Sequence, residues 1–140
     1  MSPFGKRPSA PVVAAEAQLI VGHPATLEGA SPSQPFAAVF EDDGDTGYFY
    51  ALDRRLAEQP IIDALQIYRV SAVGDRVQPS RVRIVWAEEG KSVALFINDQ
   101  AHAIVSFGRR RASCRLNFPP AAGSFTSSHA WDDSLLEPFR

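Results

Sequence analysis

Hydrophobic and polar residues alternate most regularly between residues 81 and 107. Three apolar sets each occupy one face of a predicted strand, and Arg81 and Arg83 take the opposite face of the first strand. The sets are Val82, Ile84 and Trp86; Val93, Leu95 and Ile97; and Ala101, Ala103, Val105 and Phe107. Glu88-Glu89-Gly90 and Asn98-Asp99 separate the sets with residues that suit tight turns. This period of two predicts a three-stranded antiparallel meander in which His102 points away from the inward set.

The alternation resumes after the meander. Ala112, Cys114, Leu116 and Phe118 alternate with polar residues up to Pro119-Pro120, which predicts one more amphipathic strand. Cys114 lies on the apolar face of this strand and is expected to be a core residue rather than a nucleophile. Residues 132–136 are expected to form a short C-terminal helix.

Two aromatic-rich runs, Phe36 to Glu41 and Thr46 to Leu52, flank an acidic turn. Gly and Asp tolerate the positive φ that hairpin turns require, so the pattern predicts a hairpin. Tyr48 and Tyr50 should share one face of its second strand, and Phe49 should take the other face. The acidic residues of the turn, Glu41, Asp42, Asp43 and Asp45, are expected to stand out in water.

The rest of the chain has weaker signals. Residues 1–17 are predicted to be a flexible arm rich in Pro and Ala, and residues 18–140 a single globular β-rich domain. Leu19 to Val21 reads as a short strand, and Gly22 to Pro35 as a loop with one extended piece near Ala25 to Glu28. Residues 60–70 suit either a helix or a strand, and a helical turn running into a strand at Leu65 to Val70 is the favoured interpretation.

Together these patterns predict a mainly β (α+β) fold. It would be a single antiparallel sheet or meander built from hairpins, with one or two short helices.

Composition narrows the class of protein. The chain has 140 residues, 45% of them hydrophobic and 21% charged, which is ordinary for one soluble domain. A net charge of −2 favours neither nucleic acid nor membrane as a partner, and no apolar run reaches the length of a membrane span. The single cysteine excludes an internal disulfide framework. We therefore expect a cytoplasmic protein.

The acidic turn does not match a known metal loop. An EF-hand starting at Asp43 would need ligands at Gly47 and Arg54, where none is available. The three histidines, His23, His102 and His129, lie far apart without cysteine or acid at ligand spacing. No cofactor, metal site or catalytic residue is expected, and an enzymatic role is the less favoured one.

Opposite charges gather in two segments. Residues 36–71 carry seven acids against three arginines, a net charge of −4. Arg109, Arg110, Arg111 and Arg115 form a secondary basic patch, expected to be a solvated strand edge. The residues assigned to partner binding are Glu41, Asp42, Asp43, Asp45, Tyr48 and Tyr50.

Several motifs together resemble a bacterial family catalogued as domain of unknown function 2251. They are V-F-E-D-D-G-D-T-G-Y-F-Y-A-L-D, I-I-D-A-L-Q-I-Y, V-R-I-V-W, A-L-F-I-N with A-H-A-I, C-R-L-N-F-P-P and H-A-W-D-D. The resemblance covers residues 18–140 and implies a small bacterial protein, with no catalytic residues to carry over.

Three functions from different classes remain open. The first is a non-enzymatic protein-binding module that presents the acidic hairpin to a partner with a basic surface, for example as an immunity-type inhibitor of a toxin. The second is a metal-dependent or acid–base hydrolase that uses the acidic loop and His102. The third is a structural homodimer paired through a sheet edge near the arginine run.

Overall fold

The computed structural model describes residues 10–121 and 125–140, which form two antiparallel sheets packed face to face. The five-stranded sheet has the order β1-β6-β7-β8-β9 and the four-stranded sheet the order β2-β3-β4-β5. The first contains β1 (Val12–Leu19), β6 (Ser80–Trp86), β7 (Ser92–Ile97), β8 (Gln100–Ser106) and β9 (Arg111–Cys114). The second contains β2 (Ala25–Ala30), β3 (Phe36–Asp42), β4 (Thr46–Asp53) and β5 (Ile61–Arg69).

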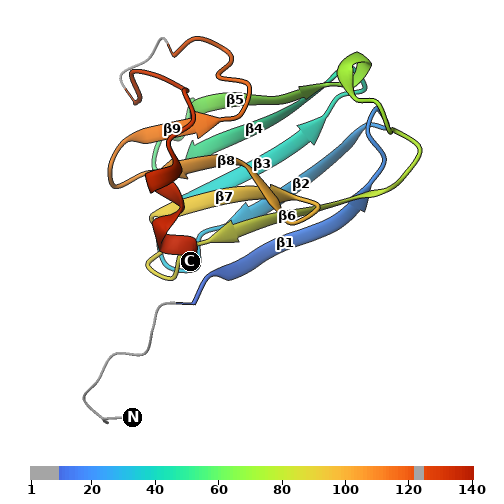
Figure 1. The fold of residues 1–140 in the computed structure, drawn as a ribbon. Coiled ribbons are helices and arrows are strands. Elements are labelled where there is room, and N and C mark those ends of the chain that lie inside the picture. Colours follow the sequence, from blue (N-terminus) through green and yellow to red (C-terminus); the bar gives the residue numbers. More distant parts are fainter. Residues whose placement is uncertain (1–9, 122–124) are drawn as a thin grey trace.

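Figure 1 shows the sheets as two layers that approach each other along both edges. Strand β1 lies beside β2 at one edge, and β5 lies beside β9 at the other. The 3₁₀ helix η2 (Asp133–Phe139) packs on the outer side of the five-stranded sheet, and η1 (Val70–Ala72) follows β5. None of the helices in the described residues is long and apolar enough to cross a membrane.

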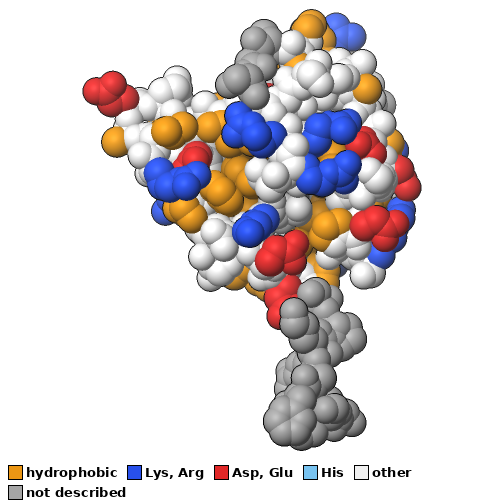
Figure 2. Space-filling view, turned by 90° about the vertical axis from the view of Figure 1, so that its left-hand side faces the viewer, with side chains coloured by type: hydrophobic (Ala, Val, Ile, Leu, Met, Phe, Trp, Pro, Cys, Tyr) orange, Lys and Arg blue, Asp and Glu red, His pale blue; other side chains and the backbone are white. Residues whose placement is uncertain are grey.

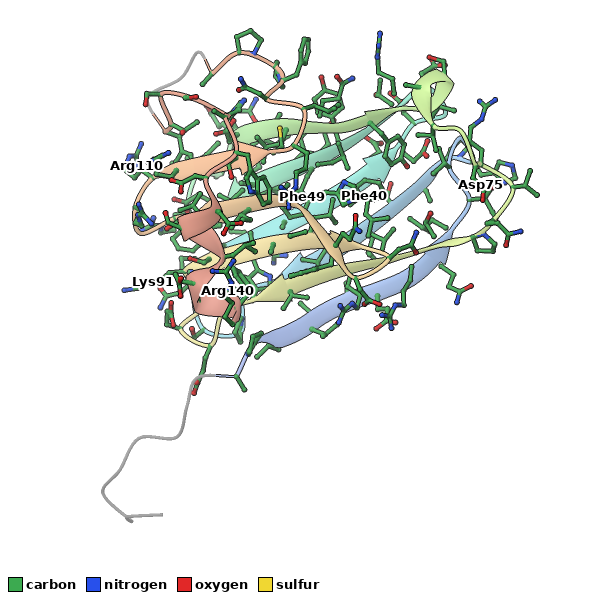
Figure 3. All side chains as sticks on the ribbon, in the orientation of Figure 1. Phe40, Phe49, Asp75, Lys91, Arg110 and Arg140 are labelled. Atoms are coloured by element: carbon green, nitrogen blue, oxygen red, sulfur yellow. The ribbon has the colours of Figure 1, made fainter. Side chains whose placement is uncertain are left out.

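The core fills the space between the layers. Phe40, Phe49 and Leu65 come from the four-stranded sheet, and Trp86 and Leu95 face them from the other sheet, all fully buried. Figure 3 shows Phe40 and Phe49 between the two layers. Alternating apolar residues must bury one face of each sheet, and stacking the two faces achieves this burial.

The mainly β, antiparallel fold built from hairpins is confirmed, and so are the meander and the C-terminal helix. The strands are divided between two sheets where the sequence suggested one. For residues 60–70 the strand from Leu65 onward is confirmed, but the helical turn expected before it is wrong, because β5 already begins at Ile61. Cys114 is buried in the core, as predicted.

Two boundaries differ from the predictions. Strand β1 begins at Val12, inside the range expected to be an arm, because it pairs with β6 and packs Ala14, Ala15 and Leu19 on the core. Residues 1–9 of that range lie outside the described residues.

Strand β9 ends at Cys114, four residues before the predicted end. Asn117 has φ of 50° and its N–H donates to the Cys114 carbonyl, so the chain turns there. This turn leaves Leu116 and Phe118 exposed instead of inward.

Candidate functional site

The acidic turn joins β3 to β4 in a three-residue loop, Asp43-Gly44-Asp45, so the predicted hairpin is confirmed. Gly44 has φ of 99°, a conformation that favours glycine. Asp43 Oδ1 accepts hydrogen bonds from the N–H groups of Thr46 and Asp45, both at 2.9 Å. These bonds, Thr46 first, lower the pKa of the exposed Asp43 carboxyl, which therefore stays ionised.

Asp42 does not stand out in water, so this part of the prediction is wrong. Only 2% of its surface is exposed, because the alternation along β3 turns it inward on the same side as Phe40. Three donors compensate the buried carboxylate: the N–H of Gly22 at 2.8 Å, the N–H of Gly44 at 2.8 Å and the Tyr68 hydroxyl at 2.6 Å. Asp42 is therefore a structural residue that ties the turn to two other segments.

Tyr68 is the aromatic partner of this buried carboxylate. Burial, and then the hydrogen bond to Asp42, raise the pKa of the Tyr68 hydroxyl far above its ordinary value, so it remains a donor. Its ring lies over Gly47, where an added Cβ would come within 2.6 Å of the ring. Gly47 thus leaves the space that lets Tyr68 reach Asp42.

The outward face of the hairpin carries the remaining predicted residues. Glu41 pairs with Tyr48 across the strands, and the Tyr48 and Tyr50 rings stack with centroids 5.8 Å apart and planes 18° apart. Both tyrosines are half-buried while Phe49 is in the core, as the alternation predicts. Burial, and then the charge of Glu41, raise the pKa of Tyr50, so its hydroxyl is neutral near pH 7. In Figure 1 neither of the two helices in residues 10–121 and 125–140 lies over this outer side of the four-stranded sheet.

We call the group formed by Glu41, Asp43, Asp45, Tyr48 and Tyr50 the hairpin surface. It combines three carboxylates that are exposed or half-buried with a stacked aromatic pair on β4. Asp42, the sixth predicted binding residue, is buried and holds the turn in place by accepting a hydrogen bond from the Gly44 N–H.

The four predicted arginines lie near the C-terminal segment. Arg111 forms an ion pair with Asp132 at 3.0 Å, and Arg115 stacks on the Trp131 ring with its guanidinium carbon 3.5 Å from the centroid. Arg110 lies over the Phe125 ring at 5.2 Å, and the Arg109 N–H donates to Ser106 Oγ. Three of the four side chains thus contact residues 125–132.

Figure 3 places Arg110 and Lys91 at the same end of the molecule. Figure 2 shows that basic side chains gather on this end but alternate with acidic ones.

A buried histidine was missed by the sequence analysis, which assigned His129 to a loop. His129 is 2% exposed, its Nε2 lies 2.9 Å from Asp63 Oδ1 in β5, and its Nδ1 contacts the Pro119 carbonyl oxygen. A carbonyl oxygen only accepts hydrogen bonds, so Nδ1 carries a proton. Because the partners are distant in sequence, no local pattern indicates this pair.

The region around Cys114 and His129 does not form a thiol-based catalytic site. Both ring nitrogens of His129 are engaged, and burial raises the pKa of the nearby Cys114 thiol. Within residues 10–121 and 125–140, no group of three or more His, Cys, Asp or Glu side chains could hold a metal ion.

His102 is also placed differently from the prediction. It has no pairing partner in β7, because Leu95 pairs with Ala103 and Phe96 with Ala101. This bulge directs His102 into a cavity between the sheets instead of away from the inward set. The described lining of that cavity does not include residues 41–45, so His102 and the acidic turn do not form one site.

Comparison with known proteins gives a relative and a family, and no solved structure. An uncharacterized protein of Haemophilus influenzae (strain Rd) is 46% identical over 74 residues, which cover 53% of this chain and 46% of that protein. The match therefore spans less than half the length of that relative. No solved structure matches the chain. The family described as an uncharacterized protein conserved in bacteria (DUF2251) matches residues 19–140, and the chain belongs to that family.

Proposed function

We propose that this protein is a non-enzymatic binding module whose hairpin surface contacts a basic segment of a protein partner. One observation supports this proposal above the others. The stacked Tyr48 and Tyr50 lie on the outward face of β4 beside the Glu41 carboxylate, and the ionised Asp43 lies at the adjacent turn. Tyrosines with neighbouring acids offer contact area and charge in one place.

The rigidity of the hairpin favours binding. Asp42 accepts a hydrogen bond from the Gly44 N–H and Asp43 accepts one from the Thr46 N–H, so both carboxylates hold the turn in place. The tyrosine rings constrain each other by stacking. A surface that is already ordered loses less conformational entropy when a partner binds. Tyrosine is also enriched among the residues that dominate binding energies.

The charge of the hairpin surface selects the class of partner. Arg or Lys side chains would lie over the tyrosine rings and pair with Glu41 and Asp45, each contact worth about 0.5–1 kcal/mol at an exposed site. Exposed carboxylates would also increase the association rate with a basic surface, and salt would weaken this effect. We therefore expect an arginine- or lysine-rich partner segment.

An immunity-type inhibitor is one specific form of this function. It requires a toxin whose basic surface is covered by the hairpin surface, and it predicts loss of toxin activity at equimolar inhibitor. The hydrolase alternative is less favoured, because His102 lies in a cavity that residues 41–45 do not line.

A labelled basic peptide tests the binding proposal directly. The probe is a fluorescein-labelled peptide in which arginine alternates with glycine, and its fluorescence anisotropy is measured at low and at physiological ionic strength. The double variant Tyr48→Ala, Tyr50→Ala should raise Kd about tenfold, since it removes two aromatic contacts of about 0.5–1 kcal/mol each. Glu41→Gln with Asp45→Asn should weaken binding by a similar factor and reduce its dependence on salt.

A variant with the same change in net charge distinguishes binding at the hairpin surface from general attraction by the charge of the whole protein. Glu58 and Glu89 are exposed acids on other loops, so Glu58→Gln with Glu89→Gln changes the net charge equally. This control should leave Kd almost unchanged. Equal weakening by both acid variants, or no effect of the tyrosine variants in a correctly folded protein, would refute the proposal. Light scattering on the same samples tests the homodimer.

A further inference from the structure

A cavity of about 460 Å³ lies between the two sheets, at the end of the molecule that carries the β5–β6 connection. Ile67 and Tyr68 of β5 form its wall on one sheet, and residues of β6, β7 and β8 form the opposite wall. Figure 3 shows Asp75 on the connecting loop at this end, opposite the end where Arg110 and Lys91 lie. The β3–β4 turn lies at this same end, where the Val70 N–H of η1 donates to the Asp45 carbonyl, but no residue of the hairpin surface lines the cavity.

Two β-bulges face this cavity. Ile67 is unpaired because Gly47 pairs with Tyr68 and Tyr48 with Gln66. His102 is the unpaired residue of the β7–β8 bulge on the opposite sheet. Bulges redirect side chains and are frequent beside binding sites, and here one bulge from each sheet contributes a lining side chain.

Most of the lining is apolar. The apolar lining residues are Leu19, Val21, Ile67, Val73, Val82 and Ile97. Binding sites for small molecules typically have this size and an apolar lining with a few polar groups.

The polar lining residues differ in exposure: Asp75, Asn98 and Gln100 are exposed to solvent, whereas Tyr68, Ser80 and His102 are half-buried. In the part of the chain that the structure describes, neither the His102 ring nor the Ser80 hydroxyl has a hydrogen-bond partner, although both are half-buried. Burial, and then the charge of Arg115, lower the pKa of His102 below 6.5, so the ring is neutral at pH 7. A neutral imidazole offers one donor and one acceptor.

We propose that this cavity binds an uncharged, largely apolar small molecule that carries a hydroxyl or carbonyl group, with His102 and Ser80 as its hydrogen-bonding partners. The apolar walls would take the body of the ligand, and its polar group would satisfy the two unpartnered side chains. A charged ligand is disfavoured, because burying a charge needs a compensating partner: the half-buried polar groups are neutral, and the one carboxylate in the lining, Asp75, is exposed to solvent.

The β5–β6 connection provides access. Between η1 and β6 all residues except Val73 are exposed, and Val73 contributes to the cavity wall. Gly74 next to it has open space around it. A small displacement of this loop would admit a ligand without disturbing either sheet.

Three small probes that share a naphthalene body and differ in charge test the proposal. They are 1-naphthol, 1-naphthoate and 1-naphthylmethylammonium, each titrated into ¹⁵N-labelled full-length protein at pH 7. Only 1-naphthol should give saturable shifts of the backbone amides of Ile67, Val82, Ile97 and His102. For a ligand of this size, Kd should be on the order of 1 mM.

Two substitutions and a control complete the experiment. Ser80→Phe should fill the cavity and weaken 1-naphthol binding about tenfold, whereas Ser71→Phe, on an exposed residue of η1, should not. His102→Phe keeps the ring volume and should remove the preference for 1-naphthol over 1-methylnaphthalene. If Ser80→Phe does not fold, the amide shifts of the unmodified protein and His102→Phe decide the question.

Shifts that do not saturate, that map outside the cavity, or that are equally large for 1-naphthoate would refute the proposal. Unchanged 1-naphthol binding in folded Ser80→Phe would refute it as well. None of these outcomes depends on whether the hairpin surface binds a basic peptide.

Discussion

Asp42 and Asp43 are adjacent and carry the same functional group, yet their surroundings give them different roles. Asp43 is exposed and accepts hydrogen bonds only from its own turn. Asp42 is buried and receives donors from the β1–β2 turn, from its own turn and from β5. A buried carboxylate is tolerated only when hydrogen bonds replace its hydration, so Asp42 is fixed by its donors.

Replacing Asp42 by Asn tests this structural role. Both carboxylate oxygens accept hydrogen bonds, whereas an amide offers one oxygen and one NH₂ group, so at least one donor loses its partner. Asp42→Asn should lower the free energy of unfolding by about 1–3 kcal/mol in urea denaturation. The exposed Asp45→Asn should change it by less than about 0.5 kcal/mol. Equal effects of the two substitutions would contradict the structural role of Asp42.

At the scale of elements, regular alternation made β3, β4, β6, β7 and β8 predictable. Strand β5 remained ambiguous because its two bulges, at Ile67 and Ile62, interrupt the period of two. The alanine-rich β1 has Leu19 as its one bulky residue packed on the core, so its pairing with β6, rather than its own pattern, identifies it as a strand. Local pattern indicates a strand best where the alternation is unbroken, or where, as in β8, a single bulge lies near one end of the strand.

The geometry of the candidate site was likewise predictable only where neighbouring residues in the sequence determine it. The hairpin, its acidic turn and the shared face of Tyr48 and Tyr50 follow from local sequence. The burial of Asp42 does not, because two of its three donors come from other segments. The inward position of His102 depends on a bulge in β8 that leaves no sequence signal.

The β3–β4 turn gives a prediction for a single glycine. Gly44 has φ of 99°, which strains any residue with a side chain, although an added Cβ would meet no atom closer than 3.8 Å. Gly44→Ala should therefore destabilise the protein by about 1 kcal/mol or more through backbone strain alone.

Gly74 is the matched control for this effect. It has no positive φ and nothing within 4 Å of an added Cβ. Gly74→Ala should be neutral or stabilise by up to about 1 kcal/mol, because it restricts the unfolded chain. Thermal melting of both variants distinguishes the two cases, and a smaller loss for Gly44→Ala than for Gly74→Ala would show that the turn does not need glycine.

At the scale of the whole molecule, the segment after β9 joins the two sheets along one edge. The Gln66 N–H in β5 donates to the Phe118 carbonyl at 2.8 Å, and the Cys114 N–H in β9 donates to the His129 carbonyl at 3.0 Å. The His129 ring then reaches across to Asp63 in β5. The segment containing Phe118 and His129 thus contacts both layers, so the stability of this edge should depend on the Asp63–His129 pair.

A double-mutant cycle on Asp63 and His129 tests this dependence. The pair is almost fully buried, with 11% of the Asp63 and 2% of the His129 side chain exposed, so either single substitution leaves a buried polar group without its partner. Asp63→Ala and His129→Ala should each cost about 2–4 kcal/mol in urea denaturation, and the double variant should cost clearly less than their sum. Amide exchange should also quicken at residues 125–131 in each single variant, while the β6–β7 amides stay protected. Additive losses, or exchange that quickens equally in both regions, would mean that the contact does not hold this edge together.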